Sequence, residues 1–240
     1  MKHRIFISIF SVFVVCILSQ QSFSQTTDSI PEIKERYGLR LGADAFKLAR
    51  SFYDENYQGL EFIGDFRISK SKYLAAEIGN EKLTTNDDRV NFITNGSYIK
   101  VGVDFNLYEN WLDMENMVFI GLRYGFSTFS QKLNAYRIYN TDNYFGENPL
   151  VISNQEFNGL TAQWAEIMLG LKAEVLSNLY VGFNVRLHIL VQQSSLENFN
   201  NLYISGFGKI SEGNRFGAGF GYTISYFVPF YNKAKNKKAR

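Results

Sequence analysis

Apolar and polar side chains alternate along most of this 240-residue chain. In the segment 98–108 every second residue is apolar: Ile99, Val101, Val103, Phe105 and Leu107. The residues between them are charged, amide or glycine. Because successive side chains of a strand point to opposite faces, this period of two predicts a strand with one apolar and one polar face.

Eight segments show this period, at 37–45, 60–68, 74–80, 98–108, 118–128, 163–175, 179–189 and 216–226. Most of them exceed the roughly five or six residues of an ordinary strand. A ten-residue strand tilted by about 45° rises roughly 24 Å, which matches the apolar band of outer-membrane barrels. We therefore predict an all-β fold, an eight-stranded antiparallel up-and-down transmembrane β-barrel.

The connections between these segments alternate in length. The first, third, fifth and seventh are long, at 46–59, 81–97, 129–161 and 190–215. The others are shorter, at 69–72, 109–117 and 176–178. Membrane barrels place short turns on the periplasmic side and longer loops outside, so the long connections are predicted to be outer loops.

The first 25 residues have the pattern of a secretory signal peptide, with a basic start, an apolar run from Ile5 to Leu18 and a polar end. The run is shorter than the roughly 20 residues of a spanning helix, and no later apolar stretch is long enough. We predict a signal peptide at 1–25, a periplasmic segment at 26–36, the barrel at 37–230 and a basic tail at 231–240. Pro229 is expected to end the last strand.

Charge and cysteine usage exclude several classes of protein. Without Lys2 and Arg4 of the predicted signal peptide, the 25 basic residues become 23 and equal the 23 acidic ones. A neutral balance argues against nucleic acid as a partner. Cys16 also lies in the signal peptide, so no disulfide is expected in the exported chain. No catalytic, cofactor or metal motif is present, and we predict no enzyme activity and no cofactor.

The segment Gly221-Tyr222-Thr223-Ile224-Ser225-Tyr226 closes the predicted barrel. It is similar to the insertion signal of small bacterial outer-membrane β-barrel proteins, the OmpA/OmpX-like group. The whole predicted mature chain resembles an outer-membrane barrel family defined only as a domain of unknown function. The resemblance implies a monomer in the outer membrane of a Gram-negative bacterium. It also implies barrel assembly machinery during insertion, and membrane lipid and lipopolysaccharide as partners.

Charges of both signs collect on the polar faces, which a membrane barrel turns inward. Eight strands leave an interior only wide enough for side chains to fill, so buried charges there must pair. We predict a salt-bridged lumen and leave conduction through it open. Its predicted residues are Arg40, Asp44, Glu61, Asp65, Arg67, Glu77, Lys100, Asp104, Arg123, Glu166, Lys172, Glu174, Arg186 and His188.

Aromatic residues mark two further regions. Those near strand ends are expected to form interface girdles, as in membrane barrels: Tyr37, Tyr73, Tyr98, Tyr108, Phe126, Trp164, Tyr226 and Phe227. The long outer loops offer contact candidates: Tyr136, Tyr139, Tyr144, Phe145, Phe199 and Tyr203. The predicted function is envelope structure or surface interaction through these loops.

Two alternatives stay open. A lipid-modifying barrel hydrolase of the deacylase kind could combine His188 with Ser225 and Glu174. A soluble lipocalin-like barrel also alternates, but its apolar face points inward, where it binds a small apolar ligand. The direction of the apolar face distinguishes this second alternative from a membrane barrel.

Overall fold

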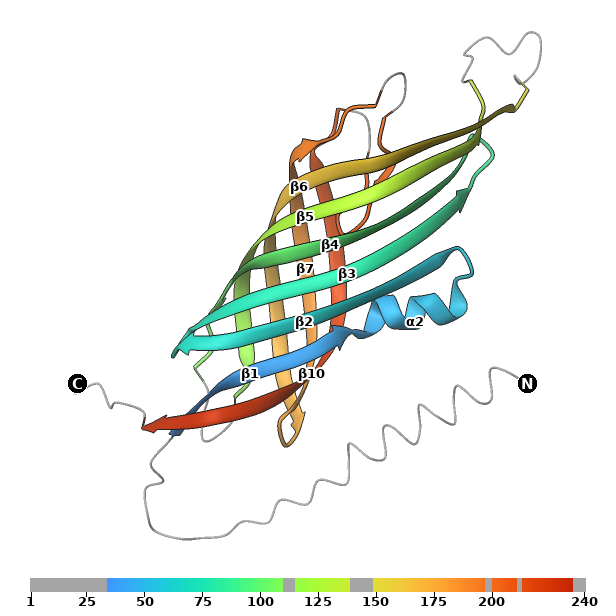
Figure 1. Cartoon of the computed structure of the whole chain (residues 1–240). Coiled ribbons are helices and arrows are strands. Elements are labelled where there is room, and N and C mark those ends of the chain that lie inside the picture. The colour runs from blue at the N-terminus through green and yellow to red at the C-terminus, as the bar shows by residue number, and fades with distance from the viewer. Residues whose placement is uncertain (1–33, 110–114, 139–148, 197–199, 211–212, 235–240) are drawn as a thin grey trace, which may run out of the picture. The chain divides into compact units, whose positions relative to one another are not determined.

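Eight antiparallel strands close into a barrel in the order β1-β10-β7-β6-β5-β4-β3-β2, as the computed structural model shows (Figure 1). The structure describes residues 34–109, 115–138, 149–196, 200–210 and 213–234. The barrel strands are β1 Lys34–Asp44, β2 Tyr57–Ser69, β3 Lys72–Asn86, β4 Val90–Asn106, β5 Met117–Tyr136, β6 Val151–Leu176, β7 Leu179–Gln193 and β10 Phe216–Ala234. Each pairs with its neighbours in sequence, and β10 pairs with β1 to close the ring. The predicted eight-stranded antiparallel barrel is confirmed.

The apolar faces of the strands point outward. Leu122, Val185 and Ile224 keep 45%, 45% and 49% of their surface exposed, whereas Arg123 and Arg186 keep 6% and 7%. In an ordinary soluble barrel the apolar set would be buried. The lipocalin-like alternative requires an apolar interior and is therefore wrong.

The strands continue well beyond the predicted segments at one end of the barrel. Only residues 87–89 separate β3 from β4, so the predicted long loop at 81–97 is wrong. Likewise, β5 and β6 extend into the predicted loop at 129–161. The pairs Asn80–Ser97, Ser97–Thr128 and Thr128–Thr161 continue the ladders there. Polar outward residues interrupt the hydrophobic pattern at this level, while the backbone pairing continues.

The last strand also runs further than predicted. β10 continues through Pro229 to Ala234, which pairs with Lys34. A bulge accommodates the proline, because Tyr37 pairs with Tyr231 and Gly38 with Pro229. The expectation that Pro229 ends the strand is therefore wrong, and the first four residues of the predicted tail belong to β10. Residues 235–240 and the predicted signal peptide lie outside the described residues.

A short helix, α2 (Ala45–Tyr53), follows β1 where the sequence predicts a loop. Asp44 caps it, because its carboxylate accepts a hydrogen bond from the Lys47 amide at 2.9 Å. None of its residues is fully buried, and Phe52 is 84% exposed. No helix among the described residues is long and apolar enough to cross a membrane.

Helix α2 occupies a gap in the strand order. β1 pairs with β2 as far as Ala43–Phe62 and with β10 as far as Asp44–Thr223. Beyond that point, among the described residues, Tyr57–Glu61 of β2 pairs only with β3 and Phe216–Tyr222 of β10 only with β7. We call this part of the wall the seam. α2 contacts both strands there and lies beside β2 (Figure 1).

Side-chain contacts on both of its sides hold α2 in the seam. The Ser51 hydroxyl donates to the Gly59 carbonyl at 3.0 Å and accepts from the Gly59 amide at 2.7 Å, as a neighbouring strand would. On the other side, the Phe46 ring packs against Phe220, with centroids 4.8 Å apart. A side chain therefore covers the edge of β2 that β1 leaves unpaired.

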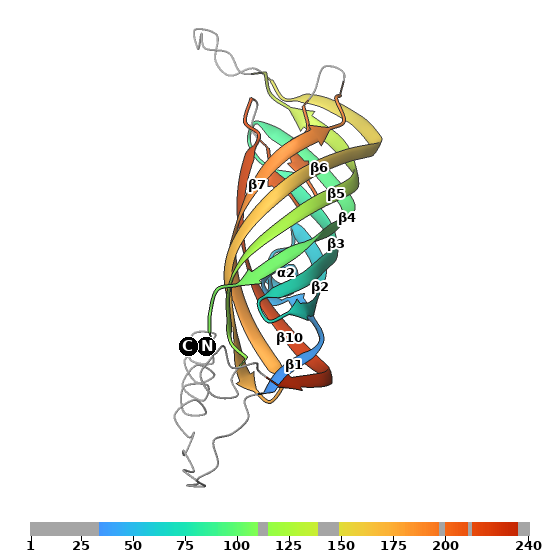
Figure 2. The same cartoon turned by 90° about the vertical axis from the view of Figure 1, so that its left-hand side faces the viewer.

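The connection from β7 to β10 turns into the barrel mouth. It contains the two-residue strands β8 (Tyr203–Ile204) and β9 (Gly208–Lys209), which pair with each other. The connection is drawn in orange at the upper end of β7 in Figure 2. Ile204 and Phe207 are buried among side chains of β4, β5, β6 and β7. Gly206, with φ of 84°, lies so close to the Tyr98 ring that a Cβ would clash with it. We call residues 202–210 the plug.

Most of the predicted girdle aromatics point inward instead. Tyr37, Tyr73, Tyr98, Trp164 and Phe227 are buried, whereas Tyr108, Phe126 and Tyr226 are exposed. Three of the buried ones belong to two apolar layers inside the barrel. The upper layer includes Tyr98 and Trp164 beneath the plug, and the lower one contains Tyr73 with Met117 and Phe119. The prediction that these five buried residues belong to an interface girdle is therefore wrong.

Candidate functional site

The barrel interior between the two apolar layers holds a network of charged side chains. Its centre is Lys100 on β4. The Lys100 ammonium lies 2.7 Å from Glu77, 3.2 Å from Glu61 and 3.8 Å from Glu166. These carboxylates come from three different strands, so Lys100 bridges the lumen. Apart from Glu174, every predicted lumen residue is buried.

Two arginines extend the network across the barrel. Arg186 on β7 lies 2.8 Å from Glu77 and 3.5 Å from Glu61. Arg123 on β5 lies 2.7 Å from Asp104 and 3.3 Å from Glu77. Glu77 therefore faces three cations, which offsets the cost of burying its charge.

Below this centre, Asp65 joins two further cations. The Lys172 ammonium donates to Asp65 at 2.6 Å, and the Arg40 guanidinium lies 3.7 Å from the same carboxylate. Arg40 also lies over the Tyr180 ring, 4.4 Å from its centroid. A planar guanidinium can pair and stack at once, which suits it to this crowded position.

The lower end of the barrel has its own ion pairs. Arg67 pairs with Glu115 at 3.0 Å, and Arg36 pairs with Glu174 at 2.7 Å. Glu174 thus lies at the barrel end rather than in the central network. Sequence reasoning missed Arg36 and Glu115, because both lie outside the predicted strands. The alternation of β1 does include Arg36, two residues before the inward-facing Gly38.

The upper end of the barrel, where the plug lies, is closed by residues that sequence reasoning also missed. Lys47 of α2 lies 2.9 Å from Glu61 and 2.7 Å from Glu81. Glu81 in turn accepts hydrogen bonds from the Tyr203 hydroxyl at 3.0 Å and the Gly206 amide at 2.9 Å. Burial raises the pKa of Tyr203 well above its usual value, and the Glu81 charge adds to the effect, so the hydroxyl keeps its proton. Glu81 lies on the same inward face of β3 as Glu77 and Gly79. Extending their alternation by two residues would have predicted its position.

His188 is held by the plug. Its Nδ1 donates to the Phe207 carbonyl at 2.8 Å, and its Nε2 lies 3.7 Å from Glu166. Ser225 pairs with Tyr180 in the ladder in which Gly217 pairs with His188, eight residues along the strand. That offset is about 27 Å. The structure therefore does not assemble Ser225, His188 and Glu174 into a triad.

The predicted outer-loop contacts have different positions. Tyr136 ends β5 and pairs with Val90 and Val151. Tyr203 belongs to the plug and points to Glu81 rather than outward. The other four candidates lie outside the described residues, namely Tyr139, Tyr144, Phe145 and Phe199.

Paired charged side chains fill the centre of the lumen. A cavity of about 20 Å³ there, lined by residues of β2, β3, β5, β6, β7 and β10, has room for little more than one water molecule. No group of three or more metal-binding side chains occurs among the described residues. Chemically, this arrangement can stabilise the barrel and block its axis.

Comparison with known proteins gives a match to a family model and a similarity to a solved structure. A family model described as a domain of unknown function (DUF6048) matches residues 2–233. The crystal structure of Ail, the attachment invasion locus protein of Yersinia pestis, is similar with a TM-score of 0.40 and 9% identity. The similarity covers 82% of this chain and 99% of Ail. No curated protein matches the chain.

Proposed function

Starting from the fact that this chain belongs to the DUF6048 family, we propose that it is a non-enzymatic outer-membrane barrel with a sealed lumen. Its role is envelope structure or surface interaction at the outer end of the barrel. The observation that carries this proposal is the direction of the side chains, apolar outward and ion-paired inward, on a closed barrel.

The outward face fits a lipid environment. On β10 the outward residues form an unbroken apolar series: Phe220, Tyr222, Ile224, Tyr226, Val228 and Phe230, each at least 40% exposed. Ten residues of strand rise about 34 Å along the strand and roughly 24 Å across the membrane at a tilt of about 45°. Soluble monomers rarely expose so large a continuous apolar surface. We infer that lipid covers it.

The interior argues against a channel. Buried cations and carboxylates pair across the barrel, and the plug covers the upper layer through Ile204 and Phe207. An ion would have to displace several of these pairs to pass. We therefore propose a barrel with a closed interior, which contacts other molecules at its ends.

The outer end offers the surface for such interactions. There β5 and β6 continue past the apolar belt, and the β7–β10 connection folds over the mouth. Export by a signal peptide, insertion by the assembly machinery through residues 221–226, a monomeric state and contact with lipopolysaccharide are parts of the same proposal.

The membrane location can be tested with two lysine substitutions. Ile224→Lys places a charge within the apolar belt, and Thr128→Lys places one on the outward face above it. A cation at the middle of the lipid face costs roughly 2–4 kcal/mol, and much less near the interface. We expect the wild-type protein and Thr128→Lys to sediment with outer membranes and to migrate heat-modifiably on gels, and Ile224→Lys to insert poorly. Recovery of wild-type protein in the soluble fraction would contradict the proposal.

The sealed lumen can be tested by electrical recording. Purified protein reconstituted in a planar lipid bilayer should give no stable conductance, whereas a general porin added to the same bilayer should. Steady ohmic current from the folded wild-type protein would show that the ion pairs and the plug leave a path.

A further inference from the structure

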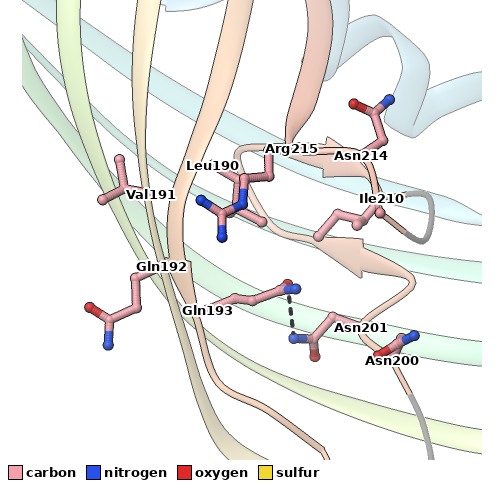
Figure 3. Close-up of a pocket in the computed structure, with 10 residues that line it drawn as sticks. Leu190, Val191, Gln192, Gln193, Asn200, Asn201, Ile210, Asn214 and Arg215 are labelled. Atoms are coloured by element: carbon pink, nitrogen blue, oxygen red, sulfur yellow. Dashed lines mark hydrogen bonds between the residues drawn. The ribbon is translucent and has the colours of Figure 1, made fainter.

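A pocket of about 390 Å³ opens at the upper end of the barrel, within the volume range of small-ligand sites. It lies between the end of β7 (Leu190–Gln193), the chain on either side of the plug and the start of β10 (Figure 3). Leu190 and Ile210 belong to or pack against the upper apolar layer, so the pocket has a firm apolar base.

Hydrogen bonds fix the walls of this pocket. The Leu190 amide donates to the Arg215 carbonyl at 2.7 Å, which joins β7 to the start of β10. The Asn201 amide group donates to Gln193 at 3.1 Å and to the Ser194 carbonyl at 2.9 Å. Figure 3 marks the hydrogen bond between Asn201 and Gln193. These bonds hold part of the pocket wall in place, which lowers the entropic cost of binding.

One buried polar atom beside the pocket has no hydrogen-bond partner among the described protein groups. Asn201 is only 3% exposed, and its Oδ1 accepts no hydrogen bond from them. A buried acceptor without a donor costs free energy, and native proteins supply nearly all such atoms with a partner. A ligand hydroxyl would supply this donor if the Asn201 side chain turned its oxygen toward the pocket.

The chemistry of the lining indicates the class of ligand. Half of the ten lining residues are carboxamides, one is arginine and none is acidic: the carboxamides are Gln192, Gln193, Asn200, Asn201 and Asn214. Carboxamides both donate and accept hydrogen bonds, as sugar hydroxyls do. Arg215 can bind a carboxylate or a phosphate through two parallel hydrogen bonds.

We propose that this pocket binds a sugar residue that carries an anionic group. The proposal rests on the proposed outer-surface location, where glycans are at hand. The anionic sugar can come from the cell's own lipopolysaccharide or from a glycan outside the cell. A neutral apolar ligand would leave the carboxamides unpaired, and a cation would be repelled by Arg215.

Binding is tested on the full mature protein, refolded in a zwitterionic detergent without sugar groups. Saturation-transfer NMR with glucuronate, glucose 6-phosphate and glucose measures each affinity. We expect both anionic sugars to bind roughly tenfold more tightly than glucose. Equal binding of all three, or no saturation with any of them, would overturn the proposal. This assay does not depend on membrane location, which the lysine substitutions test separately.

Three variants locate the site. Arg215→Gln should reduce glucuronate binding to the level of glucose, and Asn201→Ala should weaken both sugars. Lys209→Gln removes an exposed charge from β9, outside the pocket lining, and should change neither affinity. Each variant must keep heat-modifiable migration, and Arg215 is exposed enough for its loss to leave the fold intact. Unchanged glucuronate affinity in folded Arg215→Gln would overturn the site.

The source of the sugar is tested by reconstitution. Vesicles containing lipopolysaccharide are compared with vesicles of phospholipid alone. If the pocket takes the cell's own lipopolysaccharide, this lipid occupies the pocket and glucuronate binding disappears only in the vesicles that contain it. If the pocket takes free glycans, glucuronate binds equally in both.

Discussion

The ammonium group of Lys47 lies 2.7 Å from the carboxylate of Glu81, although one residue belongs to a helix and the other to a barrel strand. The same ammonium lies 2.9 Å from Glu61 on β2. Helix α2 therefore completes the wall of the barrel and also contributes a charge to its lumen. Glu81 in turn holds the plug through Tyr203 and Gly206. The helix, the network and the plug meet at this carboxylate.

Lys47→Met should destabilise the barrel by about 3 kcal/mol, because it leaves the buried Glu81 charge without this partner. Urea unfolding of the protein in detergent micelles measures the change. Lys82→Met is the matched control, because Lys82 follows Glu81 on β3 but points outward. Equal midpoints for Lys47→Met and the wild type would show that the ion pair contributes no stability.

Arg123→Ala should also destabilise the barrel, by roughly 3–5 kcal/mol, since Asp104 and Glu77 both lose a cation. The double variant Arg123→Ala/Asp104→Asn should recover part of this loss, because the unpaired charge at 104 is gone. The unfolding midpoints of the four proteins form a double-mutant cycle. A lack of coupling between the two sites would contradict the network.

Gly125→Ala should disturb the upper apolar layer. The Trp164 ring lies directly over Gly125, where an added Cβ would clash, and its indole N–H donates to Glu166 at 2.6 Å. Forcing the ring aside should cost about 1–3 kcal/mol and shift the tryptophan fluorescence. Gly219→Ala serves as the comparison. A Cβ added at Gly219 would lie 3.4 Å from its nearest neighbour, an atom of the His188 ring, which is an ordinary van der Waals contact. An identical spectrum in Gly125→Ala would mean that the ring does not occupy this position.

Ser51→Ala should loosen the seam. It removes both hydrogen bonds between α2 and Gly59, at a cost of about 1 kcal/mol, so the Gly59 amide should exchange with solvent roughly fivefold faster. Hydrogen-exchange mass spectrometry measures this rate. Ala49→Ser changes an exposed position of the same helix and should leave it unaltered. Equal exchange in Ser51→Ala would indicate that the serine does not protect this edge.

Periodicity alone predicted the strands within the apolar belt and the direction of their faces. It failed where the outward residues are polar, as at Lys82 and Ser97, because a strand outside lipid needs backbone pairing but no apolar face. It missed α2 because two helical turns show too few repeats to reveal a 3.6-residue period. The sequence pattern predicts a loop there, although Asp44 is a suitable cap.

The inward charges could be predicted as a set but not as pairs. Lys172 meets Asp65, 107 positions away, only because barrel closure and register bring their strands together. The inward aromatics were misassigned for a related reason. Tyr98 and Trp164 lie near the ends of the apolar segments, as girdle residues do, but they occupy the lumen-facing parity of their strands.

The short first strand makes the cylinder mechanically uneven. Around most of its circumference, backbone ladders resist any widening, whereas at the seam side chains of α2 take their place, through the Ser51 hydrogen bonds, the contact of the Phe46 ring with Phe220 and the Lys47 ion pairs. If lipid surrounds the barrel as proposed, a mismatch in bilayer thickness is absorbed most easily at α2. The wall then yields first where the Lys47 ammonium enters the charged interior.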